Sequence, residues 1–233
     1  MIPDNTTFAV LDTETTSADP DRGVVEVGWV FVDENLEVLS EHESLIDPQM
    51  MISPSASGVH GLTNADVASS PTLKEFFSED DPSCFGRKLP GPLVMIGHRI
   101  SFDSHTIRPY VDGEVLELCT LRWARRIYPD ADDHKLSTLA FALGLPRPTN
   151  AHRVMGDVYT ALYLARHICE RTGHTLRSLA AASQEPFELA KFPFGKHKGV
   201  DFRSVPKSYL RWARENMKDL DQDMLHTIKI CLG

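Results

Sequence analysis

The chain has 233 residues, of which 42% are hydrophobic and 24% are charged, values typical of a globular protein with its own core. They exclude a disordered chain, collagen and a disulfide scaffold. Even the apolar run Val24–Val32 is interrupted by Glu26, so no segment reaches the roughly 18 residues of a membrane span. The four cysteines are far apart, and no basic region precedes an apolar stretch at the start. We therefore expect reduced thiols, no signal peptide and a cytoplasmic location.

The charge is unevenly distributed. The net charge of −9 by itself disfavours a protein that coats long nucleic acid, because contacts to phosphate supply that affinity. Residues 191–218, however, carry eight basic and two acidic residues, so this segment is +6 and the remainder of the chain is −15. A nucleic-acid partner therefore stays open, and part of the acidic excess is available to bind metal ions.

The first elements predict an antiparallel meander. The short apolar run Thr7–Leu11 is typical of a buried strand, and it leads directly into Asp12. Second and third strands are expected at Val24–Val32 and Val38–Ile46. Turn residues at Asp33–Asn35 join these two strands, and such a short link favours antiparallel neighbours.

The next elements alternate between strand and helix. Further strands are expected at 93–96 and 115–118, and helices at 71–77, 120–128, 136–143, 153–171 and 176–182. The helix at 153–171 repeats apolar residues at helical spacing, and Gly173 is placed to end it. Strands followed by this alternation indicate an α/β sheet of mixed direction.

The C-terminal part of the chain differs in composition. We expect one domain at 1–182, a linker at 183–190 and a small basic module at 191–233. A final helix at Gln222–Leu232 has Asp221 available as its cap. A module of this size could barely fold alone, so it should pack on the larger domain or on a partner.

The basic residues of the module have two interpretations. One is a grip on nucleic acid, with phosphate contacts and base stacking from Lys196, Lys198, Lys207, Arg211, Arg214, Tyr209 and Trp212. The other is a solvated basic face over a small core, which the helical spacing of Leu210, Ala213 and Met217 favours.

Two carboxylates end the first strand. Asp12 and Glu14 are two residues apart, so their side chains share one face. Their mutual repulsion is unfavourable unless a cation lies between them. For an isolated pair of this kind, the simpler alternative is a turn-capping Asp12 and a solvent-facing Glu14.

Further polar residues lie at the ends of later elements. Asp103 follows the strand at 93–96, and Asp157 lies in the first turns of the long helix. Either could be an ordinary first-turn carboxylate, which the helix dipole favours. His152 lies five residues before Asp157 and could act as a general base or be a solvated loop histidine.

Three motifs in this order resemble a known family. They are D-x-E at Asp12–Glu14, F-D at Phe102–Asp103 and H-x-x-x-x-D at His152–Asp157, the three nuclease motifs of the DEDDh exonuclease superfamily. The likeness covers nearly the full length, and Val59–Thr63 is similar to the H-G-I-T segment of the family. The exonuclease X branch is most similar, in the segments Leu121–Pro129, Phe194–Gly199 and Tyr209–Trp212. Two positions depart from the pattern: Ser17 replaces a glycine and Arg99 replaces an asparagine.

The resemblance implies both fold and reaction. It implies a ribonuclease H-like mixed five-stranded sheet flanked by helices, with a small C-terminal α+β module. It also implies a 3′-to-5′ exonuclease that releases nucleoside 5′-monophosphates with two Mg²⁺ or Mn²⁺ ions, and hard oxygen ligands suit these ions better than zinc. Asp12 would bridge both ions, and Glu14 and Asp157 would hold the ion on the side of the attacking water. Asp103 would help to position the ion near the leaving 3′ oxygen, and His152 would accept a proton from the attacking water.

Substrate contacts also follow from the resemblance. They would involve Thr13, Thr15, Thr16, His60, Leu62, His98, Arg99 and Phe102. For each of Thr15, Thr16, His60 and Leu62 the alternative is a packed loop residue. Arg99 places a cation near the site, where it could contact substrate phosphate.

The partner and the activity have alternatives. The preferred substrate is a DNA 3′ end, single-stranded or duplex. A ribonuclease that trims RNA 3′ ends has the same chemistry, and a homodimer is possible because many relatives are dimers. A non-catalytic adaptor that binds a nucleic-acid end or a polymerase would not need the complete set of five residues, and a small-molecule phosphodiesterase would not need the basic tail.

Overall fold

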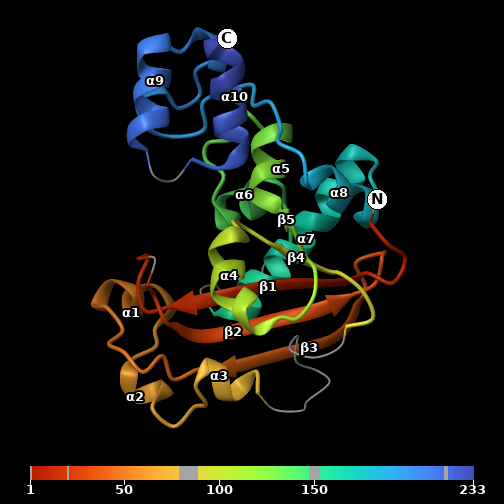
Figure 1. Cartoon of the computed structure of the whole chain (residues 1–233), viewed down its shortest axis with the longest axis vertical. Helices are drawn as coiled ribbons and strands as arrows, with labels where there is room; N and C mark the ends of the chain where they lie inside the picture. Colours follow the sequence, from red (N-terminus) through yellow and green to blue (C-terminus); the bar gives the residue numbers. More distant parts are fainter. Residues whose placement is uncertain (1, 20, 79–88, 147–152, 218–219) are drawn as a thin grey trace.

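The sheet is mixed, as the sequence predicts. The computed structural model contains five strands in the order β3-β2-β1-β4-β5. Their bounds are β1 Thr7–Thr15, β2 Val24–Val32, β3 Val38–Leu45, β4 Leu93–Gly97 and β5 Val115–Cys119. The first three form an antiparallel meander, and β4 and β5 run parallel to β1 (Figure 1). The structure describes residues 2–19, 21–78, 89–146, 153–217 and 220–233.

The helices in the described residues are α1 Pro54–His60, α2 Asn64–Val67, α3 Leu73–Phe76, α4 Ser101–Ile107, α5 Thr120–Ile127, α6 Leu136–Ala142, α7 Val154–Thr172, α8 Leu176–Ser183, α9 Lys207–Asn216 and α10 Gln222–Leu232. Six of them, α3, α5, α6, α7, α8 and α10, follow the predicted ranges. The sequence did not predict α1, although local signals define it. The Ser53 hydroxyl accepts a hydrogen bond from the Ala56 N–H, and Gly61 ends the helix at φ 77°. Within the described ranges, none of the helices combines the length and apolar character needed to cross a bilayer.

The sheet is covered on both faces. Side chains alternate along β1, so Phe8 and Val10 join the larger core, which includes residues of α5, α7 and α8. Ala9 and Leu11 point to the opposite face, where a second core includes Ile100 and residues of α4. This two-sided burial explains why the central strands are continuous apolar runs in the sequence.

One edge of the sheet gathers the polar residues. Because β1, β4 and β5 are parallel, their carboxyl ends meet at the same edge. Asp12 and Glu14 lie at this end of β1, and the loop after β4 leads directly into α4 with Asp103. The first turns of α7 pack against β1 and β2. The topology therefore brings distant carboxylates to one place.

The C-terminal residues pack around a core of their own. Phe192, Phe202, Leu210 and Met224 are all buried in this cluster, which α9 and α10 cover. In Figure 1 these two helices lie beyond α5 and α6, at the end of the molecule away from β3. Such a separate core supports the division at 1–182, 183–190 and 191–233, which stays a prediction.

A buried ion pair fixes the module against the larger domain. Arg122 of α5 donates from Nε and Nη2 to the two carboxylate oxygens of Asp223 in α10, at 2.8 and 2.7 Å. Its Nη1 donates to the Ser183 carbonyl oxygen and Nη2 also donates to the Glu185 carbonyl oxygen, and Asp223 also accepts from the Phe187 N–H. Both side chains are buried, so the pair sets the orientation of the module.

Replacing Asp223 with alanine is expected to lower the free energy of unfolding by about 3–5 kcal/mol, because Arg122 would be left buried and unpaired. Urea denaturation measures this change. Glu188→Ala removes the exposed partner of Arg203 in the same module and is the control, with no measurable change expected. Equal stability of the two variants would contradict a fixed, buried contact.

Candidate functional site

Three carboxylates converge at the end of β1. One ligand oxygen each from Asp12, Glu14 and Asp157 lies within 4.8 Å of the others. Asp12 and Glu14 share a face through strand alternation, and Asp157 lies in the first turn of α7. A close approach of α7 to β2 makes this possible, since a Cβ on Gly28 would lie 2.7 Å from the Val154 side chain.

A buried acid anchors the start of α7. Glu26 of β2 is the cross-strand neighbour of Glu14 and is 2% exposed. The Nε of Arg153 donates to both carboxylate oxygens of Glu26 at 3.0 and 3.1 Å, and the Val154 N–H donates to one of them at 3.2 Å. Glu26 therefore positions the turn that carries Asp157. Sequence reasoning missed this role, although a carboxylate within a fully buried strand was the available signal.

Asp103, in the first turn of α4, acts on this cluster but is not part of the group whose oxygens lie within 4.8 Å of one another. Its carboxylate is buried and accepts hydrogen bonds from the Thr13 N–H at 3.1 Å and the Thr13 hydroxyl at 2.7 Å. The charge of Asp103 helps to raise the pKa of Asp12, so the two carboxylates are within electrostatic reach. Thr13, which the resemblance makes a substrate contact, uses both of its donors to hold Asp103.

The carboxylates have strongly perturbed pKa values. Burial, followed by the charges of Asp103, Asp157 and Glu14, raises the pKa of Asp12 well above its ordinary value. Burial, followed by the charges of Asp157, Glu26 and Asp103, raises the pKa of Glu14 to about 8. Burial raises the pKa of Asp103 to about 7, although the hydrogen bonds from Thr13 oppose the change. Crowded hard-oxygen donors that resist ionisation fit a divalent cation, which would relieve their repulsion.

The metal-free protein is expected to lose thermal stability as pH rises from about 5 to 8. A carboxyl group whose pKa is raised by folding, as for Glu14, contributes stability below its unfolded pKa and loses it as pH rises through the folded value. Melting curves in chelator at several pH values measure this slope. Glu14→Gln should flatten it, and Mg²⁺ should raise the melting temperature more at pH 8 than at pH 5.5. A melting temperature that rises towards pH 8 in chelator would contradict the proposed repulsion among these carboxylates.

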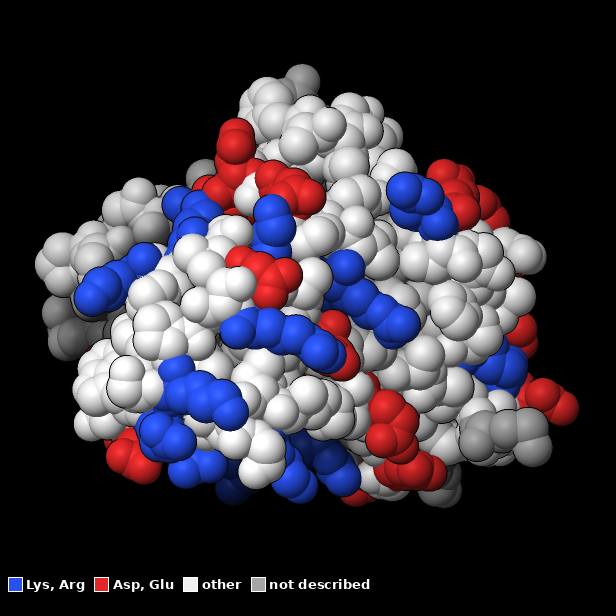
Figure 2. Space-filling view, turned by 90° about the horizontal axis from the view of Figure 1, so that it is seen from above, with Lys and Arg blue, Asp and Glu red and all other residues white. Residues whose placement is uncertain are grey.

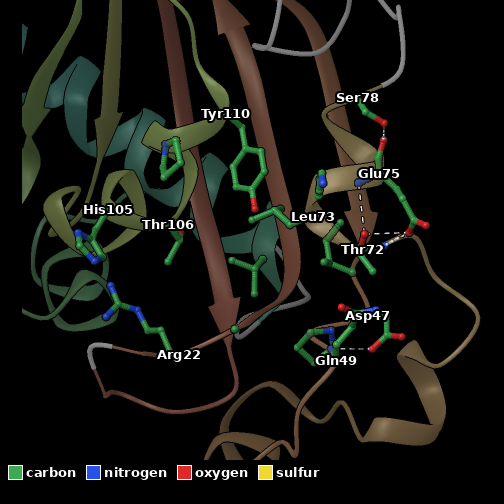
Figure 3. A pocket seen from close by; sticks show the side chains of 16 residues that line it. Arg22, Asp47, Gln49, Thr72, Leu73, Glu75, Ser78, His105, Thr106 and Tyr110 are labelled. Carbon is green, nitrogen blue, oxygen red and sulfur yellow. Dashed lines mark hydrogen bonds between the residues drawn. The ribbon is translucent and has the colours of Figure 1, made fainter.

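An arginine that the sequence did not reveal flanks Phe102. The guanidinium of Arg22 lies 3.5 Å from the centroid of the Phe102 ring, and its Nη2 donates to the Phe102 carbonyl oxygen at 2.5 Å. The positive charge of Arg22 also lowers the pKa of Asp103. Arg22 and His105 lie on the same side of a cavity of about 640 Å³ (Figure 3).

Arg99 occupies an unusual backbone conformation. Its φ of 69° is in the left-handed region, which asparagine tolerates better than arginine. The asparagine of the family pattern suits this conformation, so the substitution keeps a strained backbone and adds a cation. The Arg99 side chain is exposed and lies 5.7 Å from the centroid of the Phe102 ring.

Several other predicted substrate contacts are buried. The Thr15 hydroxyl donates to the Ser17 carbonyl oxygen at 2.8 Å, and the Thr16 hydroxyl accepts from the Gly23 N–H at 3.0 Å. Leu62 is 7% exposed and packs in a small cluster with Val25, Ile52 and Val67. These contacts stabilise the loops beside the carboxylates.

The histidines have distinct environments. His60 is buried and accepts from the Leu62 N–H at Nδ1, and Nε2 has no hydrogen-bond partner among the described residues. His98 contacts the Thr120 hydroxyl and the His134 carbonyl oxygen, and burial lowers its pKa to about 4, so its ring is neutral. His152 lies outside the described residues.

Sequence comparisons give consistent matches. A family model described as exonuclease and named for RNase T matches residues 9–165. Exodeoxyribonuclease 10 of Escherichia coli K12 is 27% identical over 226 residues, covering 94% of this chain and 96% of that protein. DNA polymerase III subunit epsilon of Aquifex aeolicus is 26% identical over 158 residues, covering 65% of this chain and 74% of that protein.

Structural comparisons give the same result. Exonuclease X in complex with 5′-overhanging duplex DNA superposes with a TM-score of 0.59 and 25% identity, over 76% of this chain and 99% of that one. An exonuclease I structure has a TM-score of 0.59 at 19% identity, over 76% of this chain and 43% of that one, and shares the fold. These superpositions confirm the predicted ribonuclease H-like fold.

Proposed function

Since this chain belongs to the exonuclease family whose model spans residues 9–165, we propose that it hydrolyses DNA from the 3′ end and releases nucleoside 5′-monophosphates. The convergence of Asp12, Glu14 and Asp157 on one point is the observation that carries the proposal. The similarity to exodeoxyribonuclease 10 over 94% of the chain supports DNA as the substrate.

The carboxylates supply the metal ligands. Asp12, Glu14, Asp103 and Asp157 would hold two Mg²⁺ or Mn²⁺ ions. When bound, the ions supply positive charge that stabilises the attacking and leaving oxygens of an in-line displacement at phosphorus. Thr13 keeps Asp103 oriented through its two hydrogen bonds, and Glu26 keeps Asp157 in place through the start of α7.

A side chain of the protein accepts the proton of the attacking water. His152 accepts a proton from the attacking water, whose oxygen forms a bond to phosphorus. The bond between phosphorus and the 3′ oxygen of the preceding nucleotide breaks, and that oxygen gains a proton. One nucleoside 5′-monophosphate is released and the shortened strand keeps a 3′-hydroxyl group.

The terminal nucleotide would lie against the loops beside the carboxylates. Phe102 is partly exposed, and its ring, which Arg22 covers on one face, would stack with the last bases on the other face. Arg99 and His98 would lie along the strand, and Thr15, Thr16, His60 and Leu62 would shape the pocket for the terminal base. His60 Nε2 offers a buried polar atom for this purpose.

A digestion panel tests the proposed function. Single-stranded and duplex DNA and RNA, each labelled at the 5′ end, are incubated with Mg²⁺, with Mn²⁺ or with chelator. The expected result is a ladder of labelled fragments that shorten from the 3′ end, faster for DNA than for RNA, and no product in chelator. Internal cleavage, shortening from the 5′ end, or equal digestion in chelator would overturn the proposal.

A further inference from the structure

A large groove separates the C-terminal module from the rest of the molecule. Its volume is about 1250 Å³, above the roughly 300–1,000 Å³ typical of small-molecule sites. One wall includes Arg99, the exposed side of β5 and Lys135, and the other includes Phe194, Lys198 and Asp221. Because the groove runs between two separate cores, its size and shape suit a chain better than a single small ligand.

The groove is more basic than the protein as a whole. Five cationic side chains and three carboxylates line it, although the chain carries a net charge of −9. Arg122 and Arg125 are paired with Asp223 and Asp221 of the module. The positive character available to a ligand therefore comes in large part from Lys135 and Lys198.

Two lysines of the groove lie beside the same carboxylate. Lys135 comes from the segment before α6, and Lys198 comes from the module. Both ammonium groups lower the pKa of Asp133, which also lines the groove, so both lie near the same carboxylate. Lys198 reaches this wall by donating to the Asp132 carbonyl oxygen. The two lysines therefore form a pair of cations contributed by opposite walls.

The groove lies beside the loop that leads to the proposed catalytic centre. His98 and Arg99 line it, and the same loop leads into α4, where Asp103 lies in the first turn. Arg99 also approaches Phe102, at 5.7 Å from the ring centroid. A polymer whose end lies at the carboxylates could therefore extend past Arg99 into the groove.

The walls are held in place before any ligand binds. The buried pair of Arg122 and Asp223 and the partly buried pair of Arg125 and Asp221 join α5 to α10. A flexible polyanion binds to a preformed groove at a lower entropic cost, because the module does not have to be ordered against the larger domain when the ligand binds. Figure 2 looks down on the module and shows Lys and Arg scattered over its outer face with Asp and Glu between them.

We infer that this groove holds the single nucleic-acid strand on the 5′ side of the nucleotide being removed, with Arg99, Lys135 and Lys198 placed on its phosphates. The inference rests on the proposed function, because the strand enters from the proposed catalytic centre. If the strand lies in the groove, the module forms the second wall of the substrate path. The module then contributes to the binding of long strands and not to that of short substrates.

The test compares short and long substrates. The double variant Lys135→Glu and Lys198→Glu is assayed on p-nitrophenyl thymidine 5′-phosphate and on 5′-labelled oligo-dT of 4 to 16 nucleotides. Lys229→Glu, an exposed lysine of α10 outside the groove, is the control and makes the same charge change as each of the two substitutions does singly. The double variant should keep wild-type kcat/KM on the small ester and lose about tenfold or more on the 16-mer. Its salt slope for oligo-dT binding should fall by about 0.7 for each lost phosphate contact.

The outcomes separate the two proposals. If the double variant hydrolyses the small ester and its kcat/KM on the 16-mer is unchanged, the groove assignment is overturned. The proposed nuclease activity is unaffected by that result. An equal loss in Lys229→Glu would do the same, because it would show a general charge effect. Failure of the wild-type protein to hydrolyse either substrate with Mg²⁺ or Mn²⁺ would instead defeat the proposed function.

Discussion

Replacing Asp12 with alanine is expected to abolish the release of mononucleotides while leaving the protein folded. Asp12 is central in the cluster, since the charges of Asp103, Asp157 and Glu14 all act on it. Its carboxylate is the one assigned to both metal ions, so its loss removes a ligand from each. The rate with Mg²⁺ and a 5′-labelled oligonucleotide measures the effect.

The fold of the Asp12→Ala variant provides the control. Removing one carboxylate from a repulsive cluster should leave the melting temperature in chelator unchanged or raise it. Glu215→Ala, which removes an exposed carboxylate of α9, should keep full activity. Measurable mononucleotide release by Asp12→Ala would remove this residue from the metal site, and a collapsed melting temperature would indicate a structural role.

Replacing His152 with alanine is expected to reduce the rate by about 10² to 10⁴, the usual contribution of a general base. Affinity for Mn²⁺ should be kept, because the carboxylates supply the ligands. The rate of the variant should also rise more steeply with pH, as hydroxide replaces the missing base.

The control for His152 is His226→Ala, a histidine of α10 that is remote in sequence from the nuclease motifs. It should retain the rate and pH profile of the native protein. An unchanged rate for His152→Ala at neutral pH would exclude this residue from proton transfer. A parallel loss of Mn²⁺ affinity would assign it to metal binding instead.

The strands could be predicted because burial leaves a simple pattern. Central strands covered on both faces read as apolar runs, and Val24–Val32 matches β2 at both ends. The helix α2 was missed because it is a single turn that depends on the contact of Thr63 with Asp66. So short a helix contains too few residues to show a period.

The site could be predicted only in part. Alternation alone places Asp12 and Glu14 together, but Asp157 required the family resemblance, since 143 positions separate it from Glu14 in the sequence. Long-range pairs such as Glu26 with Arg153, which are 127 residues apart, leave no local signal. The same holds for Arg22, which contacts Phe102 across 80 residues.

Some residues of the motifs make structural contacts within the protein, and the sequence pattern does not distinguish this role from substrate binding. Thr13 orients Asp103, and His98 joins the end of β4 to α5 and to the segment before α6. A motif shows only which residue type occurs at a position. A structural contact within the protein and a contact with substrate require the same hydrogen-bonding group. Only the contacts in the fold separate them.

The proposed function requires that four acidic side chains bind divalent cations at one site. Anomalous diffraction from crystals of the native protein soaked with Mn²⁺ locates the bound ions. We expect two peaks about 3.5–4 Å apart, bounded by Asp12, Glu14, Asp103 and Asp157. Crystals with full Mn²⁺ occupancy elsewhere and no peak among these four carboxylates would contradict this requirement.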